Sequence, residues 1–173
     1  MYGDEKRTQI ISQTGLFIAL TAIGSYITIP MIPVPFTLQT LFVLLCGCIM
    51  KRYAVVSISL YLIIGLIGLP VFHQLTSGPG ILLGPTGGYL IGFVAASFIV
   101  GIFYEKKSRI LRISGLFLGT AAILVFGVLW IAVSSGISIW SAFLIGAVPF
   151  VVGDLIKIIL AFLISERVEG IDD

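Results

Sequence analysis

Residues 149–160 decide the class of fold, and they read Pro149-Phe150-Val151-Val152-Gly153-Asp154-Leu155-Ile156-Lys157-Ile158-Ile159-Leu160. The flanking residues from 137 to 164 are mostly apolar, yet an acid and a base stand three residues apart within them. On an α-helix this spacing places Asp154 and Lys157 on one face, about one turn apart. A charge at the centre of a bilayer costs about 3 kcal/mol or more. The pair therefore indicates either a structural ion pair between helices or a polar substrate site inside a helix bundle, and we favour the site.

The composition is that of an integral membrane protein. Of the 173 residues, 58% are hydrophobic and only 10% are charged. No soluble domain of this size needs so much apolar surface, and we expect one all-α membrane domain over residues 1–173. A net charge of +2 with no basic patch argues against a nucleic-acid partner. Cys46 and Cys48 would point to different faces of a helix, so we expect neither a disulfide nor a metal site there.

The apolar runs predict a six-transmembrane-helix bundle. Three prolines between Pro30 and Pro35 predict an extended first connection, because proline is excluded from helix interiors. The second run is short for a hydrocarbon core of about 30 Å, so its polar first turn could begin inside the bundle. In the last run, Pro149 can kink the helix. The expected spans are approximately residues 9–29, 37–50, 53–69, 86–104, 113–133 and 140–164.

The basic residues predict the orientation of the bundle. Nine of the ten Lys and Arg residues fall before span one, between spans two and three, between spans four and five, or after span six. The positive-inside rule therefore places both the N and C termini in the cytoplasm. Termini on the same side require an even number of spans, which six satisfies. We expect a multi-pass protein of a bacterial-type cell (plasma) membrane.

Small residues recur at four-residue spacing in three of the expected spans. Gly88, Gly92 and Ala96 form one such row, Gly115 with Gly119 forms a second, and Gly15 with Ala19 forms a third. Small side chains at this spacing let two helix backbones approach closely. Ordinary packing inside the bundle and contact with another membrane subunit both explain these rows.

The remaining polar residues are few and fall at the start of span two, in the connection before span four, and at the start of span four. Residues 71–85 form a long, uncharged connection that we expect to fold back as a lid. A few polar groups among many apolar ones suit a small molecule with a polar end and a hydrocarbon body better than an ion pathway. A surface position for the loop histidine and an interfacial anchor role for the tyrosine are the alternatives. The candidates besides Asp154 and Lys157 are Thr37, Gln39, Thr40, His73, Gln74, Thr86 and Tyr89.

Four stretches together resemble the BioY family, the biotin-specific S components of energy-coupling factor transporters. They are residues 34–41 (VPFTLQTL), 68–72 (GLPVF), 84–93 (GPTGGYLIGF) and 153–157 (GDLIK). The resemblance spans nearly the whole chain, and the GPTGGYL block is its most specific part. It implies six transmembrane helices, high-affinity capture of biotin from outside the cell, and docking onto a transmembrane T component that carries two cytoplasmic ATPases.

The resemblance also implies roles for particular residues. The family's Asp and Lys on the last helix line the biotin pocket, and they match Asp154 and Lys157. A polar amide just after the Pro-Val-Phe stretch reaches the ligand in some members. His73 and Gln74 fall there, and either could serve. The family's small-xxx-small stripe on the first helix, which contacts the T component, falls on Gly15 and Ala19, and Ala22 could extend it.

Transport of biotin with an ATP-driven partner module is therefore the expected function, with no enzyme activity and no cofactor. Gly84-Pro85-Thr86-Gly87-Gly88 lacks the Lys-Ser/Thr ending and the preceding strand of a phosphate loop, so energy for uphill transport must come from partners or an ion gradient. An S component for another vitamin and a solitary secondary transporter remain alternatives. A membrane enzyme using Asp154 as a base would need a second catalytic group, and none is evident.

Overall fold

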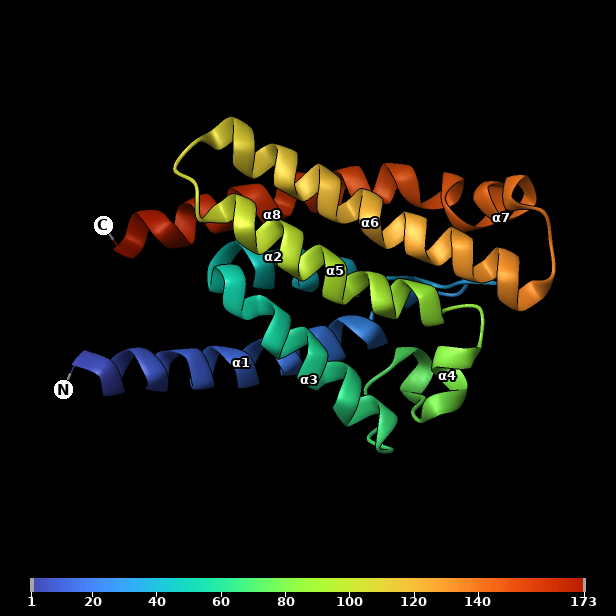
Figure 1. Cartoon of the computed structure of the whole chain (residues 1–173), viewed down its shortest axis with the longest axis horizontal. Helices are drawn as coiled ribbons and strands as arrows, with labels where there is room; N and C mark the ends of the chain where they lie inside the picture. The colour runs from blue at the N-terminus through green and yellow to red at the C-terminus, as the bar shows by residue number, and fades with distance from the viewer. Residues whose placement is uncertain (1, 173) are drawn as a thin grey trace.

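The computed structural model describes residues 2–172 and is mostly helical (Figure 1). Four helical runs among these residues are long and apolar enough to cross a membrane: Gln39–Leu66, Gly87–Tyr104, Arg109–Ser135 and Ile139–Gly170. A helical membrane protein was the class predicted from composition. The elements are α1 Tyr2–Tyr26, β1 Thr28–Ile29, β2 Phe36–Thr37, α2 Gln39–Met50, α3 Ala54–Leu66, α4 Pro79–Leu83, α5 Gly87–Tyr104, α6 Arg109–Ser135, α7 Ile139–Gly146 and α8 Val151–Asp172, with short 3₁₀ turns at Lys51–Tyr53, His73–Leu75 and Val148–Phe150.

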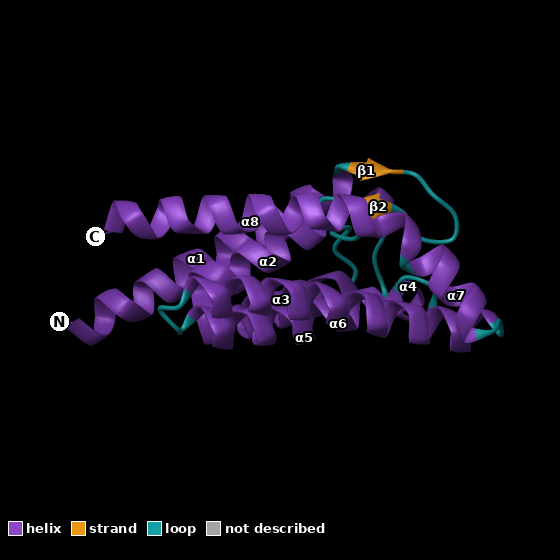
Figure 2. Cartoon of the chain, turned by 90° about the horizontal axis from the view of Figure 1, so that it is seen from above, coloured by secondary structure: helices purple, strands orange, loops and turns teal. Residues whose placement is uncertain are grey.

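The proline-rich first connection is extended, as predicted. Strands β1 and β2 form an antiparallel hairpin in which Thr28 is opposite Thr37 and Ile29 is opposite Phe36. Seen from above, the hairpin lies beside the first part of α8 (Figure 2). Three prolines between the strands prevent a helix from forming there, and the hairpin delivers residues 34–37 to the interior of the bundle.

The run from Gln39 to Leu66 reverses direction at Lys51, whose φ of 54° interrupts the helix. Ser57 near the start of α3 contacts Met50 at the end of α2, while Gln39 at the start of α2 contacts Tyr61 near the end of α3. The two helices are therefore antiparallel. With 12 residues, α2 rises only about 18 Å. Gln39 and Thr40 in its first turn are buried. This confirms the prediction that the short second run begins inside the bundle.

The last apolar stretch differs from the single helix expected over 140–164. Helix α7 ends at Gly146, a 3₁₀ turn follows at Val148–Phe150, and α8 begins at Val151. Pro149 cannot donate a backbone hydrogen bond, which accounts for the break. As a result Asp154 lies in the first turn of α8.

The two ends of the molecule have different chemistry. Both termini lie at one end, here called the terminal end, whereas the β hairpin, α4 and α7 lie at the opposite loop end (Figure 1). Ion pairs gather at the terminal end, where α2, α3, α5, α6 and α8 begin or finish. They are Lys51–Glu169, Arg52–Glu105, Arg109–Glu166, Arg112–Glu166 and Arg112–Glu169.

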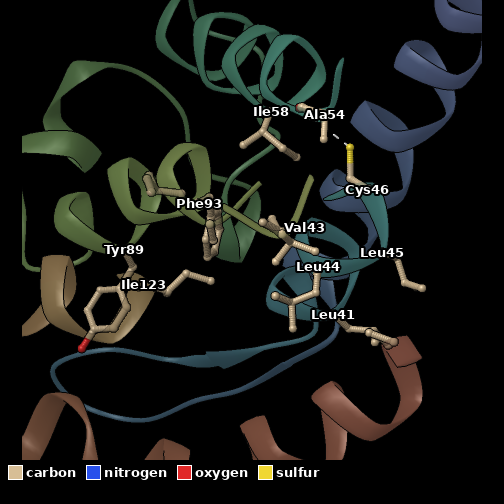
Figure 3. Packing of buried hydrophobic residues seen from close by; sticks show 14 of the residues in the cluster. Leu41, Val43, Leu44, Leu45, Cys46, Ala54, Ile58, Tyr89, Phe93 and Ile123 are labelled. Carbon is tan, nitrogen blue, oxygen red and sulfur yellow. Dashed lines mark hydrogen bonds between the residues drawn. The ribbon is translucent and has the colours of Figure 1, made fainter. Parts of the chain in front are cut away.

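Helix α2 runs through the middle of the core. Val43, Leu44 and Cys46 are fully buried, and Figure 3 shows Val43 on the side of Ile58 and Phe93, Cys46 beside Ala54, and Leu44 on the opposite side of α2. Burial on all sides is expected of an apolar helix without a polar face. The polar residues at the start of α2 are therefore held in place by a rigid centre.

Helices α5 and α6 pack closely through the small residues singled out in the sequence. A Cβ atom at Gly92 would come within 2.8 Å of the Ile123 Cα atom, and one at Gly119 would come within 2.6 Å of a Val100 methyl group. Gly88 similarly lies against the backbone of Phe126. These rows are internal packing surfaces, which decides between the two explanations for them.

Gly92→Leu should lower the free energy of unfolding by about 1–3 kcal/mol, because the added side chain must force the α5 and α6 backbones apart. Gly15→Leu is the matched control, since no atom lies within 4 Å of a Cβ built at Gly15. Thermal unfolding of the purified variants in detergent measures both effects. Equal unfolding temperatures for the two variants would contradict this packing arrangement.

Candidate functional site

A cavity at the loop end collects most of the polar candidates. It has a volume of about 50 Å³, enough for a few water molecules. A vitamin-sized ligand needs roughly 300 Å³ or more, so the lining elements must move apart to admit one. The lining residues are Val34, Pro35, Thr37, Gln39, Thr40, His73, Thr86, Tyr89, Leu90, Phe93, Ile123, Leu124, Phe150, Asp154 and Lys157.

Asp154 and Lys157 form a buried ion pair at this cavity. Lys157 Nζ lies 3.0 Å from Asp154 Oδ1, and the two residues are only 4% and 5% exposed. The break before Val151 places Asp154 at a helix N-terminus, where the helix dipole favours a negative charge. The pair is neutral as a unit, but burial still costs both groups their hydration. Further hydrogen-bonding partners, such as a polar ligand, would offset that cost.

Lys157 has a second contact that the sequence analysis did not assign. Its ammonium lies 3.8 Å from the centre of the Phe36 ring, a distance typical of a cation–π interaction. Phe36 belongs to the VPFTLQTL stretch, which was recognised as a motif without a role for this residue. The motif that contains Phe36 could therefore be read from the sequence, but the packing of β2 against α8 could not.

A chain of hydrogen bonds connects the start of α2 with the lid segment, residues 71–85. Thr37 Oγ1 donates to Gln39 Oε1 at 3.0 Å, Gln39 Nε2 donates to Tyr61 Oη at 2.6 Å, and Tyr61 Oη donates to the Val71 carbonyl at 2.8 Å. Gln39 is 3% exposed, so these bonds satisfy an amide that would otherwise be costly to bury. Tyr61, which has no place in the sequence motifs, fixes Gln39 in the cavity wall.

The lid segment brings His73 to the cavity and carries Gln74 away from it. His73 Nε2 lies 3.4 Å from Thr86 Oγ1, while its Nδ1 is buried with no hydrogen-bond partner among the described residues. Burial lowers the pKa of His73 below its ordinary value of 6.5. Gln74 has a φ of 55° and borders a separate hollow with Tyr26 and Pro30. The structure thus brings His73, but not Gln74, together with the other candidates.

Tyr89 lines the cavity with its hydroxyl already bonded. The ring packs against Gly127, and the hydroxyl donates to the Gly146 carbonyl at the end of α7. This buried position differs from that of an interfacial anchor. Tyr89 therefore shapes the cavity wall and attaches α5 to α7.

The α1 stripe lies apart from the cavity. Gly15 and Ala19 are exposed, and Ala22 is half-buried. No atom of the described residues would meet a Cβ at Gly15. The stripe is therefore a largely exposed row of small residues beside exposed apolar side chains such as Leu16 and Ile23.

Comparison with known proteins identifies relatives over almost the full length. The BioY family model matches residues 4–171. The biotin transporter BioY of Thermotoga maritima is 39% identical over 163 residues, covering 92% of this chain and 95% of the relative. The probable biotin transporter BioY of Pyrococcus horikoshii is 38% identical over 161 residues, covering 92% and 96%. The fold matches the crystal structure of the S-component for biotin from an ECF-type ABC transporter with a TM-score of 0.87 and 26% identity, over 96% of this chain and 93% of that one.

His73 should make the stability of the protein fall in acid. Because its pKa is lowered in the folded state, the unfolded chain takes up the proton first, and stability decreases as the pH drops below 6.5 towards the lowered value. Thermal unfolding between pH 7.5 and pH 5 should therefore show a larger loss for the wild type than for His73→Gln. Parallel losses in both proteins would show that His73 has no such role.

Proposed function

The chain belongs to the BioY family, and from this membership and the geometry of the cavity we propose that it is the high-affinity biotin-binding subunit of an ECF-type uptake system. It captures biotin from outside the cell and delivers it with an ATP-driven partner module. The observation that carries the proposal is the buried Asp154–Lys157 pair, which lies at a cavity lined by both polar and apolar side chains.

The chemistry of biotin suits this cavity. Its ureido ring offers two N–H donors and one carbonyl acceptor, while its second ring and side chain are largely hydrocarbon. The Asp154 carboxylate accepts from a ureido N–H, and the Lys157 ammonium donates to the ureido oxygen or holds Asp154 ionised. Charge-assisted hydrogen bonds of this kind contribute about 1.5–3 kcal/mol each. Leu90, Phe93 and Phe150 supply apolar contacts for the rest of the molecule.

Six membrane spans with both termini in the cytoplasm agree with this direction of uptake. The spans correspond to α1, α2, α3, α5, α6 and the combined α7–α8 stretch. The terminal end carries the basic residues Lys51, Arg52, Arg109 and Arg112, which the positive-inside rule assigns to the cytoplasm. The cavity at the loop end then opens towards the outside, where biotin is captured.

The energy for transport comes from partner subunits in this proposal. One matching crystal structure is that of the S-component for biotin from an ECF-type ABC transporter. The resemblance to the BioY family implies a transmembrane T component that carries two cytoplasmic ATPases. The exposed Gly15–Ala19 stripe, extended by Ala22, is the surface for the transmembrane T component. Small residues there allow a partner helix to approach the α1 backbone closely.

The neutral double variant Asp154→Asn/Lys157→Met should bind biotin at least about tenfold more weakly, as expected from losing one charge-assisted bond. It leaves no unpaired buried charge, so it should fold as well as the wild type. Titration calorimetry of the purified protein measures the affinity, with thermal unfolding as the control. Unchanged affinity, or wild-type protein in which thiamine or riboflavin displaces biotin, would contradict the proposal.

Gly15→Leu should impair assembly with the T component while leaving biotin affinity unchanged, because its side chain projects from an exposed surface far from the cavity. Co-purification with tagged partner subunits measures assembly. Leu16→Ala, at a neighbouring exposed position, controls for a general change in the α1 surface. Full assembly by Gly15→Leu, or biotin uptake by vesicles containing this chain alone, would contradict the proposed partnership.

A further inference from the structure

The ring of Phe36 faces the ammonium group of Lys157, and Phe36 does not line the cavity. Its ring centre is 3.8 Å from Lys157 Nζ, and it stacks on Phe150 with centroids 6.0 Å apart and an interplanar angle of 20°. Strand pairing with Ile29 fixes the backbone of Phe36. The ring is therefore held by the hairpin on one side and by the last helix on the other.

Gly153 makes room for this ring. A Cβ atom at Gly153 would overlap the Cζ and Cε2 atoms of Phe36. Glycine within a helix is less favourable than alanine by about 1 kcal/mol, so its presence one residue before Asp154 calls for a local reason. Close approach of the Phe36 ring to the α8 backbone supplies that reason.

The Phe36 ring and the Asp154 carboxylate stabilise the Lys157 ammonium in different ways. An ammonium carries three N–H donors, and Asp154 accepts one of them at 3.0 Å. An aromatic face attracts the positive charge through its quadrupole and adds no second negative charge to the site. Because Lys157 is 4% exposed, water contributes little to its stabilisation. The ring therefore compensates for lost hydration and leaves a donor available for a ligand.

We propose that Phe36 is a positioning residue for substrate binding, which holds the Lys157 ammonium at the cavity through a cation–π contact, and that Gly153 is present to admit it. The inference rests on the proposed biotin-binding function. It also assigns a role to the first hairpin, because the ring reaches Lys157 only when β2 lies against the start of α8.

Progressive fluorination of Phe36 tests the electrostatic part of this proposal. Fluorine withdraws charge from the ring face and changes its size little, so replacement by mono-, di- and trifluorophenylalanine weakens a cation–π contact while preserving packing. Biotin affinity should fall stepwise, by about tenfold over the series, within the range of cation–π contributions. The same series at Phe17, a buried ring on α1 that does not line the cavity, is the control and should show no trend.

A double-mutant cycle tests the role of Gly153. Gly153→Ala should weaken biotin binding by displacing the ring, whereas the same change in a Phe36→Leu background should have little further effect. Gly170→Ala is the matched control, because it lies on the same helix with no atom within 4 Å of an added Cβ. Additive effects of the two substitutions would contradict the proposed coupling.

The outcomes separate this inference from the function on which it rests. A wild-type protein that binds biotin, together with a flat fluorination series at Phe36, overturns the positioning role and leaves the proposed function intact. A wild-type protein that does not bind biotin overturns the proposed function itself. A stepwise loss at Phe36 with none at Phe17 supports the positioning role.

Discussion

The cost of removing Asp154 and Lys157 from water is the constraint on which the rest of the site depends. Two ions at 4–5% exposure are tolerated only where their remaining hydrogen-bonding capacity and charge are compensated. The structure supplies three compensations: the ion pair itself, the N-terminus of α8 and the Phe36 ring. A polar ligand would supply a fourth. The part of the desolvation cost that the first three leave uncompensated favours binding of such a ligand.

The break between α7 and α8 creates this environment. Without it, a continuous helix would place Asp154 in mid-helix, where the dipole gives no help. Broken helices at membrane depth are tolerated where the freed backbone groups line a cavity or meet other protein groups. Here the Tyr89 hydroxyl donates to the carbonyl of Gly146, one of the groups exposed at the end of α7. The helix break therefore places Asp154 at the cavity, and Tyr89 in the cavity wall satisfies a backbone group that the break exposes.

The sequence predicted those features that depend on one helix or one connection alone. Helical runs, the extended Pro30–Pro35 connection and the shared face of Asp154 and Lys157 follow from local periodicity and proline chemistry. The contacts of Phe36 and Tyr61 could not be predicted, because they depend on which elements meet across the bundle. Gln74 points away from the cavity that His73 lines because the backbone is left-handed at Gln74 and Leu75. Residues other than glycine rarely adopt this conformation, so the sequence does not predict it.

An experimental structure of the purified protein with biotin bound tests the central claim most directly. The account predicts one biotin molecule inside the cavity at the loop end, with a polar atom of the ligand within hydrogen-bonding distance of the Asp154 carboxylate or the Lys157 ammonium. Biotin bound elsewhere, or an Asp154–Lys157 pair facing lipid and remote from the ligand, would contradict it.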